Sequence, residues 1–161
     1  MNSLLSRAAQ TAIAIALIGS VVVQAMILPA IYRDLTDAPP VARVTFVVLL
    51  GLGILALQVF AVCVWRLLTR VRAGTVFAVG AFREIDVIAW SLGVVVVVLV
   101  TIALMLAPGG TAPGAVGLIG GAAVVICGVV LLVRVMKGLL RQAIAREDEV
   151  VGLRTELGEV I

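Results

Sequence analysis

Three long stretches of the chain contain no charged residue, and their lengths predict the fold. They run from Ala8 to Tyr32, from Val44 to Trp65 and from Val87 to Val133. A helix needs about 20 apolar residues to cross the roughly 30 Å hydrocarbon core of a bilayer. The first two stretches match one crossing each, and the third is long enough for two because Pro and Gly interrupt it within Ala107–Gly114. The pattern therefore predicts an all-α membrane protein with four transmembrane helices, at about residues 11–31, 44–65, 87–106 and 115–133.

The same pattern predicts how the chain is divided. We expect a four-helix transmembrane domain over residues 1–133 and a helical tail over residues 134–161, because no Pro interrupts the chain after the fourth crossing. The first helix also has features of a signal peptide, with a basic residue, an apolar run and a small residue at Ala25. Because the apolar run continues beyond Ala25 to Ile31, we expect this helix to be retained.

Arginine and lysine predict the orientation of the helices. Segments on the cytoplasmic side of membrane proteins carry an excess of these residues. With the N-terminus inside, only Arg33 and Arg43 of the 12 basic residues lie outside, and the reverse threading inverts that ratio. Both termini are therefore predicted to be cytoplasmic, together with the segment that joins the second and third helices.

Composition agrees with the membrane assignment and narrows the chemistry. The chain is 63% hydrophobic with a mean hydropathy of +1.29, against about 45–50% apolar residues in soluble proteins. It has no histidine, and Cys63 and Cys127 form no Cys-x-x-Cys motif, so we expect no metal and no cofactor. Ionisable residues are absent from the predicted helix interiors, and only Glu84 and Asp86 supply carboxylates at a membrane surface. We expect that the protein is not an enzyme.

Two glutamines are the most polar groups in the predicted helices. At 1.5 Å per residue, Gln24 lies roughly 20 Å from the inner boundary and Gln58 roughly 10 Å, so we do not expect them to pair directly. Each is predicted to form interhelical hydrogen bonds, which contribute about 0.6 kcal/mol each in membranes. The alternative is a polar lumen, which would make the protein a subunit of a homo-oligomeric pore or small-molecule transporter.

Small residues recur at intervals that let helices pack closely. Gly117 and Gly121 form a Gly-x-x-x-Gly motif on the fourth helix, with Gly128 further along, and Gly51 and Gly53 lie on the second helix. We predict that these glycines are helix-packing positions. An internal helix is the preferred partner of the fourth helix, and a second copy, giving a homodimer, is the alternative.

The segment between the second and third helices is basic and contains a helix stop. Gly74 suits the left-handed conformation that ends a helix, and Thr75 can cap the next one. Arg83 and Asp86 are three residues apart, so they can pair on one helix face. One interpretation is a turn that only fixes topology, and the other is a docking platform for a cytoplasmic protein.

The tail divides into a basic and an acidic half. Arg134, Lys137 and Arg141 suit the anionic inner leaflet, which attracts each such residue by about 1 kcal/mol near the surface. From Glu147 onward acidic residues predominate, so this half is expected to point away from the membrane. An acidic helix with an apolar stripe can dock in a groove of a basic protein. The alternative is a solvated helix that merely ends the bundle.

Several motifs resemble a bacterial membrane-protein family, Domain of Unknown Function family 2975. They are the Gly74–Phe77 turn, Arg83 and the tail Leu153–Ile161, and the resemblance covers essentially the whole chain. Members of that family are often encoded beside a small Cro-type helix-turn-helix protein. The resemblance implies a multi-pass protein of the bacterial inner membrane that binds such a regulator and does not itself contact nucleic acid. The predicted docking residues are Arg70, Arg72, Gly74, Phe77, Arg83, Glu147, Asp148, Glu149, Leu153, Glu156 and Leu157.

Overall fold

The structure is a computed structural model that describes residues 3–36, 38–72, 80–109 and 112–159; of residues 3–6, 71–72, 80–82, 144–145 and 147–159 it describes the backbone alone. All regular structure in these ranges is helical. Four of the helical segments are long and apolar enough to cross a membrane, which confirms the predicted fold class. The elements are α1 (Ser3–Val22), η1 (Val23–Ile27), α2 (Leu28–Asp34), α3 (Pro40–Arg72), α4 (Gly80–Leu106), η2 (Ala107–Gly109) and α5 (Pro113–Glu159).

The helices continue beyond the charge-free stretches that predicted them. Helix α3 begins at Pro40 and ends at Arg72, and α5 continues without a break to Glu159. Proline is favoured in the first turn of a helix, where its missing N–H has no partner to lose. Arginine is a good helix former, and its long apolar stem can lie along the bundle while the charge reaches water. A charged residue therefore marks the membrane boundary without ending the helix.

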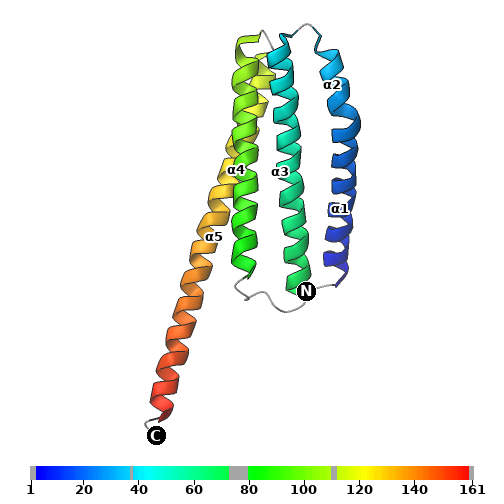
Figure 1. Ribbon diagram of the computed structural model, residues 1–161. Helices are drawn as coiled ribbons and strands as arrows, with labels where there is room; N and C mark the ends of the chain where they lie inside the picture. The colour runs from blue at the N-terminus through cyan, green and yellow to red at the C-terminus, as the bar shows by residue number, and fades with distance from the viewer. Residues whose placement is uncertain (1–2, 37, 73–79, 110–111, 160–161) are drawn as a thin grey trace.

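The helices form an antiparallel bundle (Figure 1). Helix α3 lies between α1 and α4, and α4 packs against both α3 and α5. Helices α1 and α4 begin at the same end of the bundle, where α3 ends and beyond which α5 projects; we call this the terminal end. The end of α2, the beginnings of α3 and α5, and η2 lie at the opposite end.

Helix α4 supplies most of the buried core. Its apolar side chains pack against α3 on one side and α5 on the other, with Cys63 of α3 in contact with Ile88 and Leu92. Lipid offers no hydrophobic driving force between helices, so van der Waals packing of this kind holds the three helices together. Helix α1 is peripheral, since the apolar window of its membrane span contains no buried residue. The buried hydrophobic residues are Ala56, Cys63, Ile88, Ala89, Leu92, Val95, Val98, Ile102 and Ala123.

A wider helical turn interrupts the first membrane span. The π-helical segment η1 covers Val23–Ile27, and Pro29 follows it in the first turn of α2. Within a regular α-helix, the ring of Pro29 would clash with the carbonyl group of Ala25. Pro29 also has no backbone N–H to donate to that carbonyl oxygen. The π-helical turn relieves this conflict. It also places Gln24 inside the irregular segment.

Glycines on α3 allow close helix contacts, whereas those on α5 have open space around the position of an added Cβ among the described residues. A Cβ added at Gly53 would lie 3.3 Å from Cγ1 of Val98 on α4, and one at Gly51 would lie 3.1 Å from Cδ2 of Leu28. Close packing at Gly51 and Gly53 is therefore confirmed. On α5, a Cβ added at Gly117, Gly121 or Gly128 would meet no described atom within 4 Å, so the role of these three glycines in helix packing stays a prediction.

Candidate functional site

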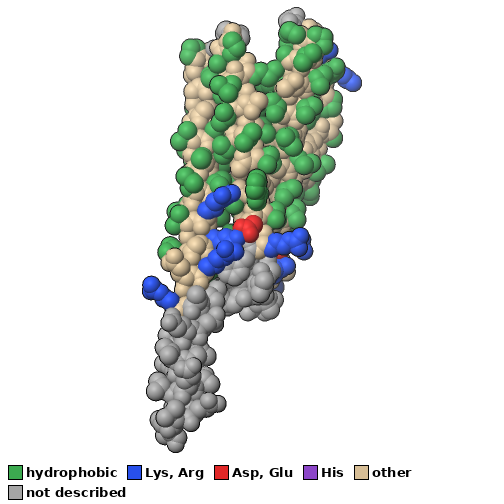
Figure 2. Space-filling view, turned by 60° about the vertical axis from the view of Figure 1, so that its left-hand side comes forward, with side chains coloured by type: hydrophobic (Ala, Val, Ile, Leu, Met, Phe, Trp, Pro, Cys, Tyr) green, Lys and Arg blue, Asp and Glu red, His purple; other side chains and the backbone are tan. Residues whose placement is uncertain are grey.

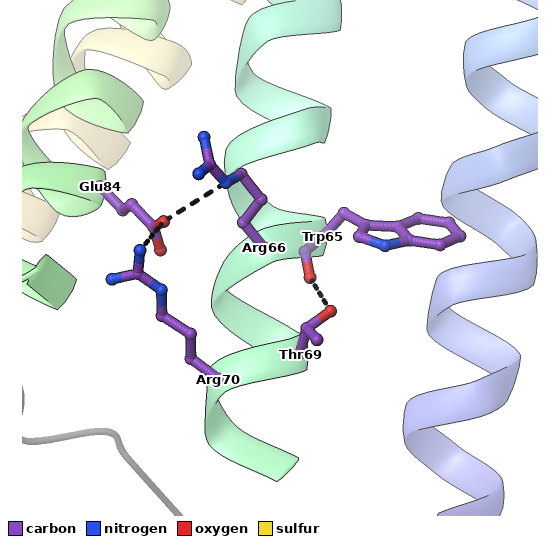
Figure 3. A network of polar contacts seen from close by, with 5 residues as sticks. All are labelled: Trp65, Arg66, Thr69, Arg70 and Glu84. Atoms are coloured by element: carbon purple, nitrogen blue, oxygen red, sulfur yellow. Dashed lines mark hydrogen bonds and ion pairs between the residues drawn. The ribbon is translucent and has the colours of Figure 1, made fainter. Parts of the chain in front are cut away.

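A buried carboxylate joins α3 and α4 at the terminal end. Oε1 of Glu84 lies 3.1 Å from Nη2 of Arg70 and 3.8 Å from Nε of Arg66 (Figure 3). Glu84 is only 7% exposed. Arg66 and Arg70 are four residues apart, so they lie one turn apart on the same face of α3. The two guanidinium groups therefore hold the end of α3 against the beginning of α4.

The second carboxylate oxygen of Glu84 makes the protein more dependent on this ion pair. Oε2 is buried and has no hydrogen-bond partner among the described residues. A buried charge destabilises a protein strongly when its partner is removed, because the remaining charge is not compensated. Glu84 was not among the predicted site residues. The signal that could have revealed it is the four-residue spacing of Arg66 and Arg70, which presents two cations to one neighbouring helix.

A second ion pair joins α4 and α5. Nζ of Lys137 contacts Oδ1 of Asp86 both as a hydrogen bond and as an ion pair. The Lys137 side chain is 12% exposed and that of Asp86 is 53% exposed, so the ammonium group is enclosed and the carboxylate faces outward. The predicted pairing of Asp86 with Arg83 is wrong, because Lys137 from another helix takes that place.

More basic side chains surround this pair. Arg134 and Arg141 lie three residues before and four residues after Lys137, and hence on the same face of α5. Both are exposed. Figure 2 shows basic side chains gathered around an acidic one at the lower edge of the hydrophobic surface. We call Arg134, Lys137 and Arg141 the α5 basic cluster.

A chain of polar contacts connects α1 and α3 within the apolar part of the bundle. Nε2 of Gln58 donates to Oγ of Ser20 at 2.9 Å and to Oε1 of Gln24 at 3.0 Å. Nε2 of Gln24 donates in turn to the carbonyl oxygen of Gly51 at 3.4 Å. The expectation that the two glutamines do not pair is therefore wrong, whereas the predicted interhelical hydrogen bonds are present.

The prediction that Gln24 and Gln58 do not pair was wrong because it measured their depths in the membrane from the ends of the charge-free stretches. Gln10 of α1 bonds to Thr69 of α3 at 3.3 Å, and this pair reveals the register of the two antiparallel helices. In that register Gln58 lies level with Ser20. Gln24 lies in η1, four residues beyond Ser20 along the same membrane span and within reach of a long amide side chain. Since these amides bond to each other, they lend no support to the pore alternative.

The predicted docking residues fall into three groups. Arg70 is engaged with Glu84 inside the bundle, and Arg83 is exposed at the terminal end. Gly74 and Phe77 lie outside the described residues, and Arg72 is described in its backbone alone. The same is true of the acidic tail residues, which lie on the α5 backbone with undescribed side chains: Glu147, Asp148, Glu149, Leu153, Glu156 and Leu157. Their role in docking stays a prediction.

Comparison with models of known protein families gives a match over almost the whole chain. Residues 8–161 match the model of a family described as protein of unknown function (DUF2975). No curated protein matches the chain, and no solved structure matches it. The match covers the whole membrane region and the tail, in agreement with the extent of the resemblance seen in the sequence.

Proposed function

The chain belongs to the DUF2975 family, and from this premise we propose that it is a regulatory protein of the bacterial inner membrane that binds a small helix-turn-helix transcription regulator. The regulator would bind at the terminal end and be held at the membrane or released from it. The observation that carries this proposal is the projection of α5 beyond the other helices (Figure 1). This extension supports the proposal because it offers a helix surface outside the bundle to a partner.

The projecting part of α5 has the length and charge of a docking element. The membrane span of this helix ends at Ala143, and the helix continues to Glu159. At 1.5 Å per residue, this extension reaches about 24 Å beyond the span. Acidic residues predominate in it, with Glu147, Asp148, Glu149, Glu156 and Glu159 against Arg146 and Arg154. A DNA-binding regulator carries a basic surface, which is complementary to this charge.

The proposal requires the terminal end to face the cytoplasm. The basic residues support this orientation, since Arg66, Arg70 and the α5 basic cluster all lie at the terminal end. A reporter fused after Ile161 tests it directly. A fluorescent protein that matures only in the cytoplasm should be bright there, and an alkaline phosphatase that is active only outside should be silent. The reverse result would place the tail outside and remove the proposed partner's access.

Co-purification with a small helix-turn-helix regulator from the native host tests the docking. The intact protein should retain the regulator in mild detergent, and deletion of residues 147–161 should release it. A triple variant, Glu147→Gln, Asp148→Asn and Glu149→Gln, keeps the length of the helix and should weaken binding through charge alone. Arg33→Gln at the opposite end is the matched control and should bind as the wild type does. Unchanged retention after the deletion would show that the tail is not the docking element.

A further inference from the structure

An apolar groove opens beside the α5 basic cluster, and we propose that it binds one anionic phospholipid. The groove has a volume of about 340 Å³ and lies where α3, α4 and α5 meet. This inference is independent of the regulator, because it rests on groups inside the bundle. The lining residues are Leu67, Ile85, Ile88, Val133, Met136, Lys137 and Leu140.

The lining combines an apolar wall with a single cation. Six of the seven lining residues are hydrophobic, and the seventh is Lys137. An acyl chain can lie against the apolar wall at no cost in hydrogen bonding, since its methylene groups need no polar partner. The ammonium group of Lys137 is the only lining group that can recognise a headgroup. The groove therefore has the two parts that a phospholipid requires.

Charge selects an anionic headgroup. Lys137 is largely enclosed, and Arg134 and Arg141 flank it on the same helix face. Against these three cations stands one carboxylate at the groove, that of Asp86. The other nearby charges, Arg66, Arg70 and Glu84, pair with one another across α3 and α4. The named groups around the groove, five cations and two carboxylates, thus carry an excess of three positive formal charges, five minus two.

The position of the groove favours a lipid over a soluble anion or a peptide. Its α4 and α5 residues belong to the membrane spans Arg83–Leu106 and Pro113–Ala143. Next to it on α5, Val135, Met136 and Leu139 are about 60% exposed and continue the apolar surface outward. A basic cluster at the end of an apolar span is where the phosphate of a lipid in the same leaflet lies.

Asp86 then acts as a competitor for the headgroup. The carboxylate of Asp86 forms an ion pair with the ammonium group of Lys137. The Asp86 side chain is about half exposed, so water can solvate its carboxylate once Lys137 binds another anion. A phosphate that binds Lys137 takes the place of this carboxylate. Removing the ammonium should therefore weaken lipid binding, whereas removing the carboxylate should strengthen it. A purely structural ion pair would respond in the same direction to both changes.

Native mass spectrometry of the full chain in mild detergent measures this difference. The probes are phosphatidylglycerol and phosphatidylcholine with identical acyl chains. The wild type should retain the anionic lipid preferentially, and Lys137→Gln should lower that retention about fivefold, the equivalent of about 1 kcal/mol for one basic residue. Asp86→Asn should raise it. Arg33→Gln, at the opposite end, should leave it unchanged.

A groove-filling variant keeps the test informative if Lys137→Gln fails to fold. Leu140→Trp leaves every charge in place and should reduce retention of phosphatidylglycerol by occluding the apolar wall. Three results would overturn the proposal: equal retention of the two lipids, a change in the same direction for Lys137→Gln and Asp86→Asn, or displacement of the lipid by an equal concentration of glycerol phosphate. The last would identify a site for a soluble anion.

Discussion

Replacement of Gln58 by leucine removes the polar connection between α1 and α3 and should loosen α1 from the bundle. Gln58 donates two hydrogen bonds, at 2.9 Å to Ser20 and at 3.0 Å to Gln24. Interhelical hydrogen bonds in membranes contribute about 0.6 kcal/mol on average, so the loss of both should destabilise the protein by about 1.2 kcal/mol. That is about an eightfold change in the unfolding equilibrium. The effect should be measurable because the apolar part of the first membrane span has no buried residues, so little apolar packing would hold α1 against α3.

Unfolding of the purified protein by sodium dodecyl sulfate in mixed micelles measures this free energy. Thr101→Val is the matched control, because its hydroxyl donates only to Val97 of its own helix, at 2.7 Å. A double-mutant cycle with Gln24→Leu isolates the contact between the two amides, and its coupling energy should be about 0.6 kcal/mol. A loss for Gln58→Leu no larger than that of Thr101→Val would refute the reasoning. A coupling energy of zero would refute the direct pairing.

Two further substitutions, together with one control, test the packing around α4. Glu84→Gln should destabilise the terminal end by about 1–2 kcal/mol, which is less than for a fully buried ion pair because Arg66 is largely exposed to solvent. The same unfolding assay measures this loss. An unchanged free energy of unfolding would mean that the ion pair does not stabilise the bundle. Gly53→Val should cost about 1–3 kcal/mol by overpacking against Val98, whereas Gly121→Val, which meets no described neighbour, should be tolerated. Equal costs for the two glycine variants would contradict the close approach of α3 and α4.

The number and order of the helices could be predicted because apolar length is a local property. Each membrane span needs its own run of apolar residues, and the loops between spans contain Pro and Gly, as at Ala107–Gly114. The ends of the helices could not be read in this way. Arg66 and Arg70 end the charge-free run and yet lie inside α3, since their backbone hydrogen bonds are satisfied within the helix.

Contacts between helices depend on register, which the sequence does not show directly. The pairing of Gln58 with Gln24 follows from how far α1 and α3 slide past each other, and that is set by the turn and by the π-helical segment before Pro29. The pairing of Lys137 with Asp86 depends in the same way on the connection between α4 and α5. Local spacing favoured Arg83 as the partner of Asp86, and tertiary packing overruled it.

Because α5 is one continuous helix, the number of residues between the bundle and the tail determines the direction in which the tail side chains point around the helix axis. The helix spans the bundle and projects beyond it as one continuous α-helix from Pro113 to Glu159. Each residue turns an α-helix by about 100° and lengthens it by about 1.5 Å. One residue inserted after Ala143 would therefore leave the packed part of α5 in place and swing the acidic side chains beyond it about a quarter of a turn around the axis. The angular phase of the tail, as well as its charge, is thus encoded in the length of this helix.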